Sequence, residues 1–271
     1  MNAIFISVRT GSTRLPQKAI KKIKNKTTIE HLIDRLKQSK NAKKIILCTT
    51  TKKEDDILCK IAENNNIDYF RGSEEDKLLR WYDASKYFNI KYFVNVDGDD
   101  IFFDHGLADL VLEQIENTKC DFVDGHGLYN DVYGITYNGL EAVIKNKTSK
   151  KTEFIKPFFE DISNKIKIEK IKNVPEKYKK TKIRFTLDYK EDFLFFKEII
   201  DYFIENKIPM TFEAILSYIK DNPSITKINF FREEDWSSNQ KKMFNIWLNM
   251  CKTVYFSVSL NKRTANRNDR N

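Results

Sequence analysis

Residues 3–18 read AIFISVRTGSTRLPQK, and this stretch decides the fold. The four apolar residues at its start predict a short buried strand. The following stretch, Ser7–Lys18, is predicted to be a loop because Gly11 and small hydroxyl residues interrupt the apolar pattern. A loop after the first strand of an α/β sheet lies at the carboxyl edge of the sheet, where ligands bind.

This loop is chemically suited to a polyphosphate. It carries the cationic side chains of Arg9, Arg14 and Lys18 among backbone amides that are free to donate. Arginine donates bidentate hydrogen bonds to phosphate oxygens, lysine supplies a point charge, and loop amides approach the oxygens closely. The alternative is an ordinary basic surface loop. The loop is not a Walker loop, because it lacks the final Gly-Lys-Ser/Thr, and it has one glycine where a dinucleotide fingerprint needs three.

The residues that follow alternate between strand and helix patterns. Thr28 precedes apolar residues at helical spacing and is the expected N-cap of the first helix. Strands are predicted over 45–48, 67–70 and 92–96, and helices over about 29–36, 55–61 and 77–88. This order predicts an α/β fold with a mostly parallel, doubly wound sheet.

The second half of the chain continues the mixed pattern. Further helices are predicted over about 106–117, 140–145, 193–206 and 214–220, and strands over 121–124, 133–137, 165–174 and 182–188. A last helix begins near Arg232 and contains Trp236, Phe244 and Trp247. The apolar patch 154–159 is either core or an oligomer surface.

Acidic residues follow two of the predicted strands. Asp97, Asp99 and Asp100 come directly after strand 92–96, and Asp188 ends the strand predicted at 182–188. Carboxylates clustered at the end of a buried strand are costly unless a cation lies there, and Mg²⁺ takes one or two carboxylates plus phosphate oxygens. A solvated turn is the alternative, since Asp and Gly are frequent turn residues.

Composition limits the class of protein. The chain has 271 residues, 41% of them apolar, which suffices for one large α/β domain or two small ones. No stretch approaches the roughly 18 apolar residues of a membrane helix, and the N-terminus lacks the signal-peptide order, so we expect a cytoplasmic protein. The four cysteines form no C-x-x-C pair, which argues against a zinc site or a disulfide framework.

The net charge of +9 is concentrated in two segments. Residues 145–182 hold thirteen lysines and five acidic residues, and residues 261–271 hold four cations and one aspartate. Basic patches can bind nucleic acid. The segment 145–182, however, contains no arginine and does not interleave aromatic residues with its lysines. A nucleic-acid partner is therefore not expected.

Four separated stretches resemble, in order, the motifs of the sugar cytidylyltransferases of the spore-coat-polysaccharide and 3-deoxy-manno-octulosonate types. They are RTGSTRLPQK at 9–18, ILCTT at 46–50 with FRGSEEDKL at 70–78, VNVDGDD at 94–100, and RFTLDYKED at 184–192. The resemblance spans about residues 1–230. It implies an α/β nucleotidyltransferase of the nucleotide-diphospho-sugar transferase, or glycosyltransferase-A-like, fold, with a small extra β/α subregion.

The resemblance also implies roles for individual residues. Arg9, Arg14 and Lys18 would hold the triphosphate and would be the catalytic residues together with Asp99, while Asp99 and Asp188 would hold Mg²⁺. The other nucleotide-binding residues that it implies are Gly11, Ser12, Thr13, Thr50, Arg71, Gly72, Ser73 and Asp97. Of these, Thr50, Arg71 and Ser73 would lie near the nucleobase.

We therefore expect a Mg²⁺-dependent cytidylyltransferase. It would join CTP to a small acceptor, an acidic sugar or a related polyol or phosphonate, and release pyrophosphate for surface polysaccharide synthesis. The expected organisation is a nucleotidyltransferase domain at 1–230, a helical extension at 231–260 and a disordered basic tail at 261–271. A homodimer is the candidate assembly.

Three alternatives stay open. The first is a sugar-phosphate nucleotidyltransferase that uses another nucleoside triphosphate. The second is a non-catalytic basic protein that binds nucleic acid or a partner. The third is a degenerate family member that acts as a partner subunit. In that case Gln17, where the family usually has glycine, and Asp97, where it usually has a neutral residue, would mark lost activity.

Overall fold

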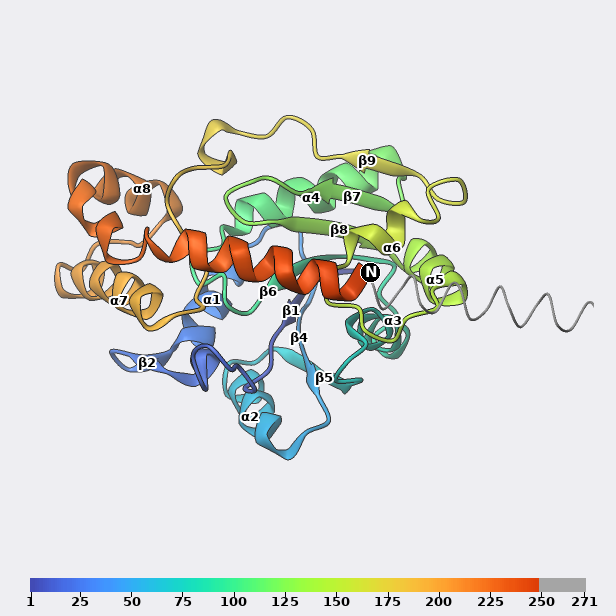
Figure 1. The fold of residues 1–271 in the computed structure, drawn as a ribbon, viewed down its shortest axis with the longest axis horizontal. Helices are drawn as coiled ribbons and strands as arrows, with labels where there is room; N and C mark the ends of the chain where they lie inside the picture. The colour runs from blue at the N-terminus through green and yellow to red at the C-terminus, as the bar shows by residue number, and fades with distance from the viewer. Residues whose placement is uncertain (249–271) are drawn as a thin grey trace, which may run out of the picture.

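The computed structural model describes residues 1–248, which form a layered α/β structure around one seven-stranded sheet (Figure 1). The strand order is β5-β4-β1-β6-β8-β7-β9. The first four strands are parallel neighbours: β5 (Asp68–Gly72), β4 (Ile45–Thr50), β1 (Asn2–Ser7) and β6 (Tyr92–Asp97). Their carboxyl ends therefore meet at a single edge of the sheet.

The other strands complete the sheet beyond β6. β8 (Val132–Thr136) is antiparallel to both β6 and β7 (Phe122–Gly125), and β9 (Ile168–Lys170) is parallel to β7. The sheet is thus mostly parallel, and the predicted fold class is confirmed. The strand predicted at 165–174 is wrong in its length, because only three of its residues pair with β7.

Helices cover both faces of the sheet because side chains alternate along β1. Ile4 and Ile6 belong to the larger apolar core, whereas Ala3 and Phe5 belong to a second core on the opposite face. The helices that contribute buried side chains to the larger core are α1 (Thr28–Leu36), α2 (Asp56–Asn64), α4 (His105–Thr118), α7 (Lys190–Glu205) and α8 (Phe212–Asp221). The second core receives α3 (Lys77–Tyr87), α5 (Tyr137–Asn146) and α6 (Lys156–Glu160).

Short elements connect these layers. They are the hairpin β2 (Lys22–Ile23) and β3 (Lys26–Thr27), and the 3-10 turns η1 (Lys18–Ile20), η2 (Lys53–Asp55), η3 (Glu176–Tyr178) and η4 (Pro223–Ile228).

Helix α1 begins one residue earlier than the sequence suggested. Its N-cap is Thr27, not Thr28, because Thr27 and Glu30 form a capping box. The Thr27 hydroxyl accepts the Glu30 N–H, and the Glu30 carboxylate accepts the Thr27 N–H at 2.7 Å. This box satisfies two amides that would otherwise be left unpaired at the start of the helix.

Residues 232–248 form the helix predicted to begin near Arg232. Trp247 near its end is buried and packs against Phe154 and Phe158. Phe158 and Phe159 are buried as well, so the apolar patch 154–159 belongs to the core. The tail predicted at 261–271 and part of the extension predicted at 231–260 lie outside the described residues. Among the residues described, no helix has the length and apolar character that crossing a membrane requires.

Candidate active site

A lysine and two aspartates from distant parts of the chain meet at the carboxyl edge of the sheet. Lys18 Nζ lies 2.6 Å from Asp99 Oδ2 and 2.9 Å from Asp188 Oδ1. Arg14 joins the same group, with Nη2 2.5 Å from Asp188 Oδ1. The structure therefore brings together four of the residues predicted from the sequence, two from the loop after β1, one after β6 and one before α7.

Asp188 reaches this group without the strand predicted at 182–188. That prediction is wrong, since the segment is irregular and its amides bond elsewhere. The Leu187 N–H donates to the Asp99 carbonyl at 2.9 Å, and the Asp188 N–H donates to the Asp192 carboxylate at 2.9 Å. A single backbone bond thus ties the Asp188 segment directly to the turn that carries Asp99.

The cluster is charged. Burial disfavours the Lys18 ammonium, but the carboxylates of Asp99 and Asp188 outweigh burial and raise the Lys18 pKa. Burial likewise opposes ionisation of Asp188, and Lys18 and Arg14 outweigh it and lower the Asp188 pKa. The protein therefore holds the cations of Lys18 and Arg14 against Asp188 Oδ1, although the Asp188 side chain is largely buried.

The three aspartates at the end of β6 and in the turn after it have separate environments. Asp97 pairs with Lys77 Nζ at 2.6 Å, while Asp99 faces Lys18. Asp100 is buried and accepts from Asn130 Nδ2 at 2.6 Å; burial and the neighbouring acids raise its pKa well above the ordinary value. Asp99 is thus the member of the three that joins the Lys18 cluster.

Gly98 allows this turn to pack against the start of the loop. A Cβ atom at position 98 would lie 2.6 Å from Val8 Cβ, closer than such atoms approach. The Gly98 N–H also donates to the Ser7 carbonyl at 2.9 Å. The missing side chain therefore lets the turns after β1 and β6 lie side by side.

Asp55 anchors the loop, a role that the sequence did not reveal. Its Oδ1 accepts from the Thr10 N–H at 2.8 Å and the Thr10 hydroxyl at 2.7 Å, and its Oδ2 accepts from the Thr50 hydroxyl. Burial opposes ionisation, but these donors lower the Asp55 pKa. The sequence pattern predicts only that a helix begins near Asp55, because the pairing with Thr10, 45 residues away, is a tertiary contact with no local signal.

Gln17, which stands where the resembled family usually has glycine, adopts an unusual backbone conformation. Gln17 has φ 56° and ψ 28°, a left-handed conformation that glycine adopts without steric penalty. The chain nevertheless turns correctly for Lys18 to reach both carboxylates. Glutamine at this position therefore strains the loop without removing its cation.

Residues predicted near a nucleobase gather at the ends of β4 and β5. Arg71 Nε donates to the Thr50 carbonyl at 2.9 Å, and Nη1 pairs with Asp56 at 2.6 Å. Gly72 is the register partner of Thr50, and the Ser73 hydroxyl accepts from the Asp76 N–H. Through these contacts Arg71 stabilises the turn after β4.

Other residues of the loop are exposed, among them Arg9 and Gly11. Arg9 is about half exposed and its Nη2 is 4.0 Å from Glu153 Oε2, so it does not contact the Lys18 cluster. A pocket of about 460 Å³ adjoins the loop. Its lining includes Thr10, Gly11, Ser12 and Gln17 from the loop, and Glu54 and Ile57. Thr13 is exposed.

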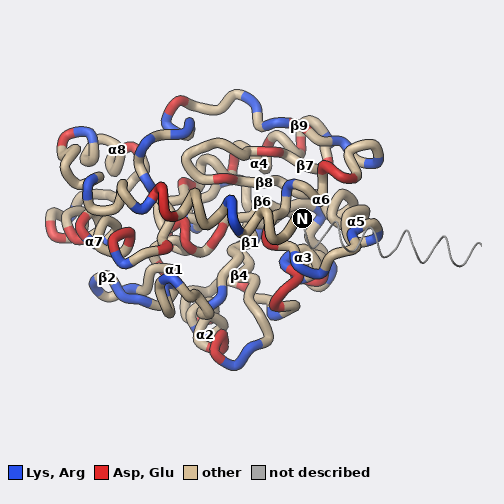
Figure 2. Tube along the Cα trace, in the orientation of Figure 1, with Lys and Arg blue, Asp and Glu red and all other residues tan. Residues whose placement is uncertain are grey.

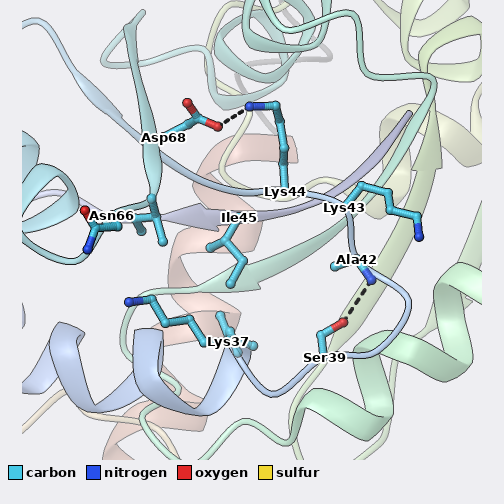
Figure 3. A pocket seen from close by; sticks show the side chains of 10 residues that line it. Lys37, Ser39, Ala42, Lys43, Lys44, Ile45, Asn66 and Asp68 are labelled. Carbon is cyan, nitrogen blue, oxygen red and sulfur yellow. Dashed lines mark hydrogen bonds and ion pairs between the residues drawn. The ribbon is translucent and has the colours of Figure 1, made fainter.

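A second pocket, of about 430 Å³, lies at the opposite edge of the sheet (Figure 3). It is bounded by the end of α1 and the starts of β4 and β5, and contains the ion pair of Lys44 with Asp68 at 2.6 Å. It contains none of the residues predicted for the site, so the carboxyl edge remains the candidate active site.

The donors at the carboxyl edge fit a hard divalent cation. Asp99 Oδ2 and Asp188 Oδ1 converge on one atom, Lys18 Nζ, within 2.9 Å. Mg²⁺ commonly takes one or two carboxylates and completes its shell with water and phosphate oxygens. No group of three or more His, Cys, Asp or Glu side chains within residues 1–248 has metal-binding geometry, so the other ligands would come from a substrate and water.

The fold is that of a nucleotidyltransferase, and comparison with known proteins identifies the family. The family model described as cytidylyltransferase matches residues 3–220. The chain belongs to the cytidylyltransferase family, which confirms the resemblance seen in the sequence.

Two relatives are similar over most of the chain. An uncharacterized protein of Methanocaldococcus jannaschii is 33% identical over 230 residues, which are 83% of this chain and 93% of that protein. The spore coat polysaccharide biosynthesis protein SpsF of Bacillus subtilis is 26% identical over 205 residues, 71% of this chain and 84% of that protein.

Solved structures agree with this assignment. A cytidylyltransferase from Leptospira borgpetersenii superposes with a TM-score of 0.73 at 29% identity, covering 83% of this chain and 96% of that one. CMP:2-keto-3-deoxy-manno-octonic acid synthetase complexed with CTP has a TM-score of 0.58 at 12% identity, covering 74% of this chain and 98% of that one. The second likeness shows the shared fold alone.

Proposed function

We propose that the protein is a Mg²⁺-dependent CTP:sugar cytidylyltransferase. It transfers CMP to an acidic sugar, or to a related polyol or phosphonate, and supplies the activated donor for surface polysaccharide synthesis. The observation that carries the proposal is the convergence of Lys18, Arg14, Asp99 and Asp188 at the carboxyl edge of the sheet. Cations beside paired carboxylates are what binding of a metal–triphosphate requires.

The mechanism needs little covalent chemistry from the protein. An acceptor oxygen attacks the α-phosphorus in line, the bond from that phosphorus to the bridging oxygen breaks, and pyrophosphate leaves with the electron pair. Arg9, Arg14 and Lys18 bind the triphosphate and stabilise the charge that develops on the leaving pyrophosphate. Asp99 and Asp188 would hold Mg²⁺, which would supply neutralisation of the phosphate charge.

Other residues would position the nucleotide. The loop amides of Gly11, Ser12 and Thr13 would donate to phosphate oxygens. Thr50, Arg71 and Ser73 would contact the nucleobase side, with support from their position at the ends of β4 and β5.

No described histidine contacts the Lys18 cluster, so none is assigned as the base for the acceptor hydroxyl. The His31 Nε2 lies 3.0 Å from the Ile23 carbonyl, and His126 Nδ1 lies 2.7 Å from Asp131. The acceptor proton is therefore expected to leave without a histidine relay.

The proposal of a nucleic-acid-binding protein finds less support. Seven of the thirteen lysines in residues 145–182 pair with acidic side chains, namely Lys145, Lys147, Lys156, Lys167, Lys172, Lys177 and Lys179. Figure 2 shows basic and acidic residues interspersed along the chain trace. This pairing reduces the positive field that a nucleic acid would need.

Pyrophosphate release tests the proposal. The protein is incubated with Mg²⁺, each of the four nucleoside triphosphates in turn, and a panel of sugar, polyol and phosphonate acceptors. We expect release with CTP and an acidic sugar. Release only with another triphosphate would favour a sugar-phosphate nucleotidyltransferase, and no release with any pair would favour a family member without activity.

A further inference from the structure

The helix at residues 232–248 lies beyond residue 220, where the match to the family model ends. It nevertheless contacts the segment that carries Asp188. Glu233 Oε2 accepts from Arg184 Nη1 at 3.1 Å, and the Trp236 ring lies over the same guanidinium, 5.5 Å from its centre. The helix therefore meets the site through Arg184.

Arg184 connects this helix to the Asp188 carboxylate. Its side chain is 1% exposed, and its Nη2 lies 3.4 Å from Asp188 Oδ2. Arg14 and Lys18 bond to the other oxygen, Asp188 Oδ1. Because each oxygen has its own cationic partners, Arg184 restricts rotation of the carboxylate and directs Oδ1 toward the loop.

Glu233 in turn restricts Arg184. Asp192 accepts from Arg184 Nε at 2.9 Å and from Nη2 at 3.2 Å, which leaves Nη1 to Glu233. Within residues 1–248, Nη1 has no other acceptor. Loss of the Glu233 carboxylate would therefore leave Nη1 of the buried Arg184 guanidinium without its partner. The guanidinium could then shift relative to Asp188.

The helix is attached at its far end too. Trp247 Nε1 donates to the Lys151 carbonyl at 3.0 Å, and its ring packs on Phe154 and Phe158. The neighbouring Glu153 faces Arg9, at the other end of the loop from Arg14. Figure 1 shows this helix, orange to red, crossing the front of the molecule from α7 toward α6. The helix is therefore held at both ends, and these contacts keep Glu233 next to Arg184.

We propose that Glu233 is a positioning residue for nucleotidyl transfer. Through Arg184 it holds the Asp188 carboxylate in the orientation that the phosphate-binding loop and Mg²⁺ need. This inference rests on the proposed function. The helix at residues 232–248, which lies outside the family match, would thus contribute to the function of the site.

The test compares Glu233→Ala with Asp235→Ala. Asp235 lies on the same turn and pairs with Arg232 at 2.7 Å, but it has no contact with Arg184, so it is the matched control. Four quantities are measured: the unfolding midpoint, CTP affinity in Mg²⁺ by calorimetry, and kcat and KM for pyrophosphate release.

We expect Glu233→Ala to weaken CTP affinity and kcat/KM by about three- to tenfold, below the usual loss for direct partners of a metal ligand because it acts one residue further away. Asp235→Ala is expected to stay within twofold of wild type, and both variants to keep the unfolding midpoint within a few degrees. Equal losses in both variants, or none in Glu233→Ala, would overturn the inference.

A double-mutant cycle with Arg184→Lys tests whether Glu233 affects Asp188 through Arg184. If Glu233 acts through Arg184, Glu233→Ala should have almost no further effect in the Arg184→Lys background. An undiminished effect there would contradict the path. A wild-type protein that neither binds CTP with Mg²⁺ nor releases pyrophosphate refutes the proposed function instead, so the two failures are distinct.

Discussion

Lys18 Nζ lies 2.6 Å from Asp99 Oδ2, although the two residues are 81 positions apart in the chain. The contact joins the loop after β1 to the turn after β6, and Asp188 completes it from a third segment. The residues proposed to hold phosphate and the residues proposed to hold Mg²⁺ therefore form one charged cluster.

The cation at position 18 is expected to be essential for transfer. Lys18→Met keeps most of the side-chain length but removes the charge that offsets Asp99 and Asp188 and stabilises the pyrophosphate. We expect kcat/KM to fall by at least about 100-fold, the usual loss for one electrostatic contact to a transition state.

Lys44→Met is the matched control for this variant, because Lys44 pairs with Asp68 at the same distance of 2.6 Å at the opposite edge of the sheet. Initial rates of pyrophosphate release provide the comparison. Similar rates for the two variants would show that Lys18 has no special role.

Asp55→Asn should loosen the loop. The carboxylate accepts from Thr10 and Thr50, and its replacement weakens a buried network at a cost of about 1–3 kcal/mol in the free energy of unfolding. We also expect a higher KM for CTP, since Thr10 lies in the loop. Chemical denaturation and steady-state kinetics measure the two effects, and an unchanged KM would show that the anchor serves stability alone.

The pH dependence of this variant follows from the lowered Asp55 pKa. A carboxylate with a lowered pKa in the folded state stabilises the protein above its ordinary pKa of about 4 and loses that contribution as pH falls through the folded value. The stability difference between wild type and Asp55→Asn should therefore be full at pH 7 and shrink in acid. A difference that grows in acid would contradict the role of the ionised carboxylate.

Gln17→Gly tests the strain in the loop. Left-handed backbone costs about 1–2 kcal/mol for a residue with a Cβ atom, while glycine costs about 0.5–1 kcal/mol through the unfolded chain. At φ 56° the first effect is the larger one, so we expect a small rise in the unfolding midpoint with activity retained. A lower midpoint would show that contacts of the Gln17 side chain outweigh the backbone strain.

Much of the sheet could be predicted because local patterns define it. Apolar runs bounded by polar loops indicated β1, β4 and β6, and these strands are consecutive neighbours inside the sheet. The strand predicted at 182–188 failed because an apolar alternation says nothing about whether a neighbouring strand is available. Its amides bond instead to Asp192 and to the Asp99 carbonyl.

The site could be predicted only in part for the same reason. The resemblance to the sugar cytidylyltransferases implied that Lys18, Asp99 and Asp188 belong to one site, and the structure places Lys18 in contact with both aspartates. The anchoring of Thr10 by Asp55 and the contact of Glu233 with Arg184 join segments 45 and 49 residues apart. Only the folded chain reveals such pairings.

The most direct test of the account is the rate of pyrophosphate release by Asp99→Asn, measured with Mg²⁺, CTP and the acceptor that gives the highest wild-type rate. Asp99 is partly exposed, so the variant is expected to fold, which circular dichroism can verify. Asp188→Asn is measured beside it, and Asp68→Asn is the control at the opposite edge. We predict that Asp99→Asn and Asp188→Asn abolish turnover while Asp68→Asn retains it; wild-type rates in both site variants would contradict the assignment of the two carboxylates.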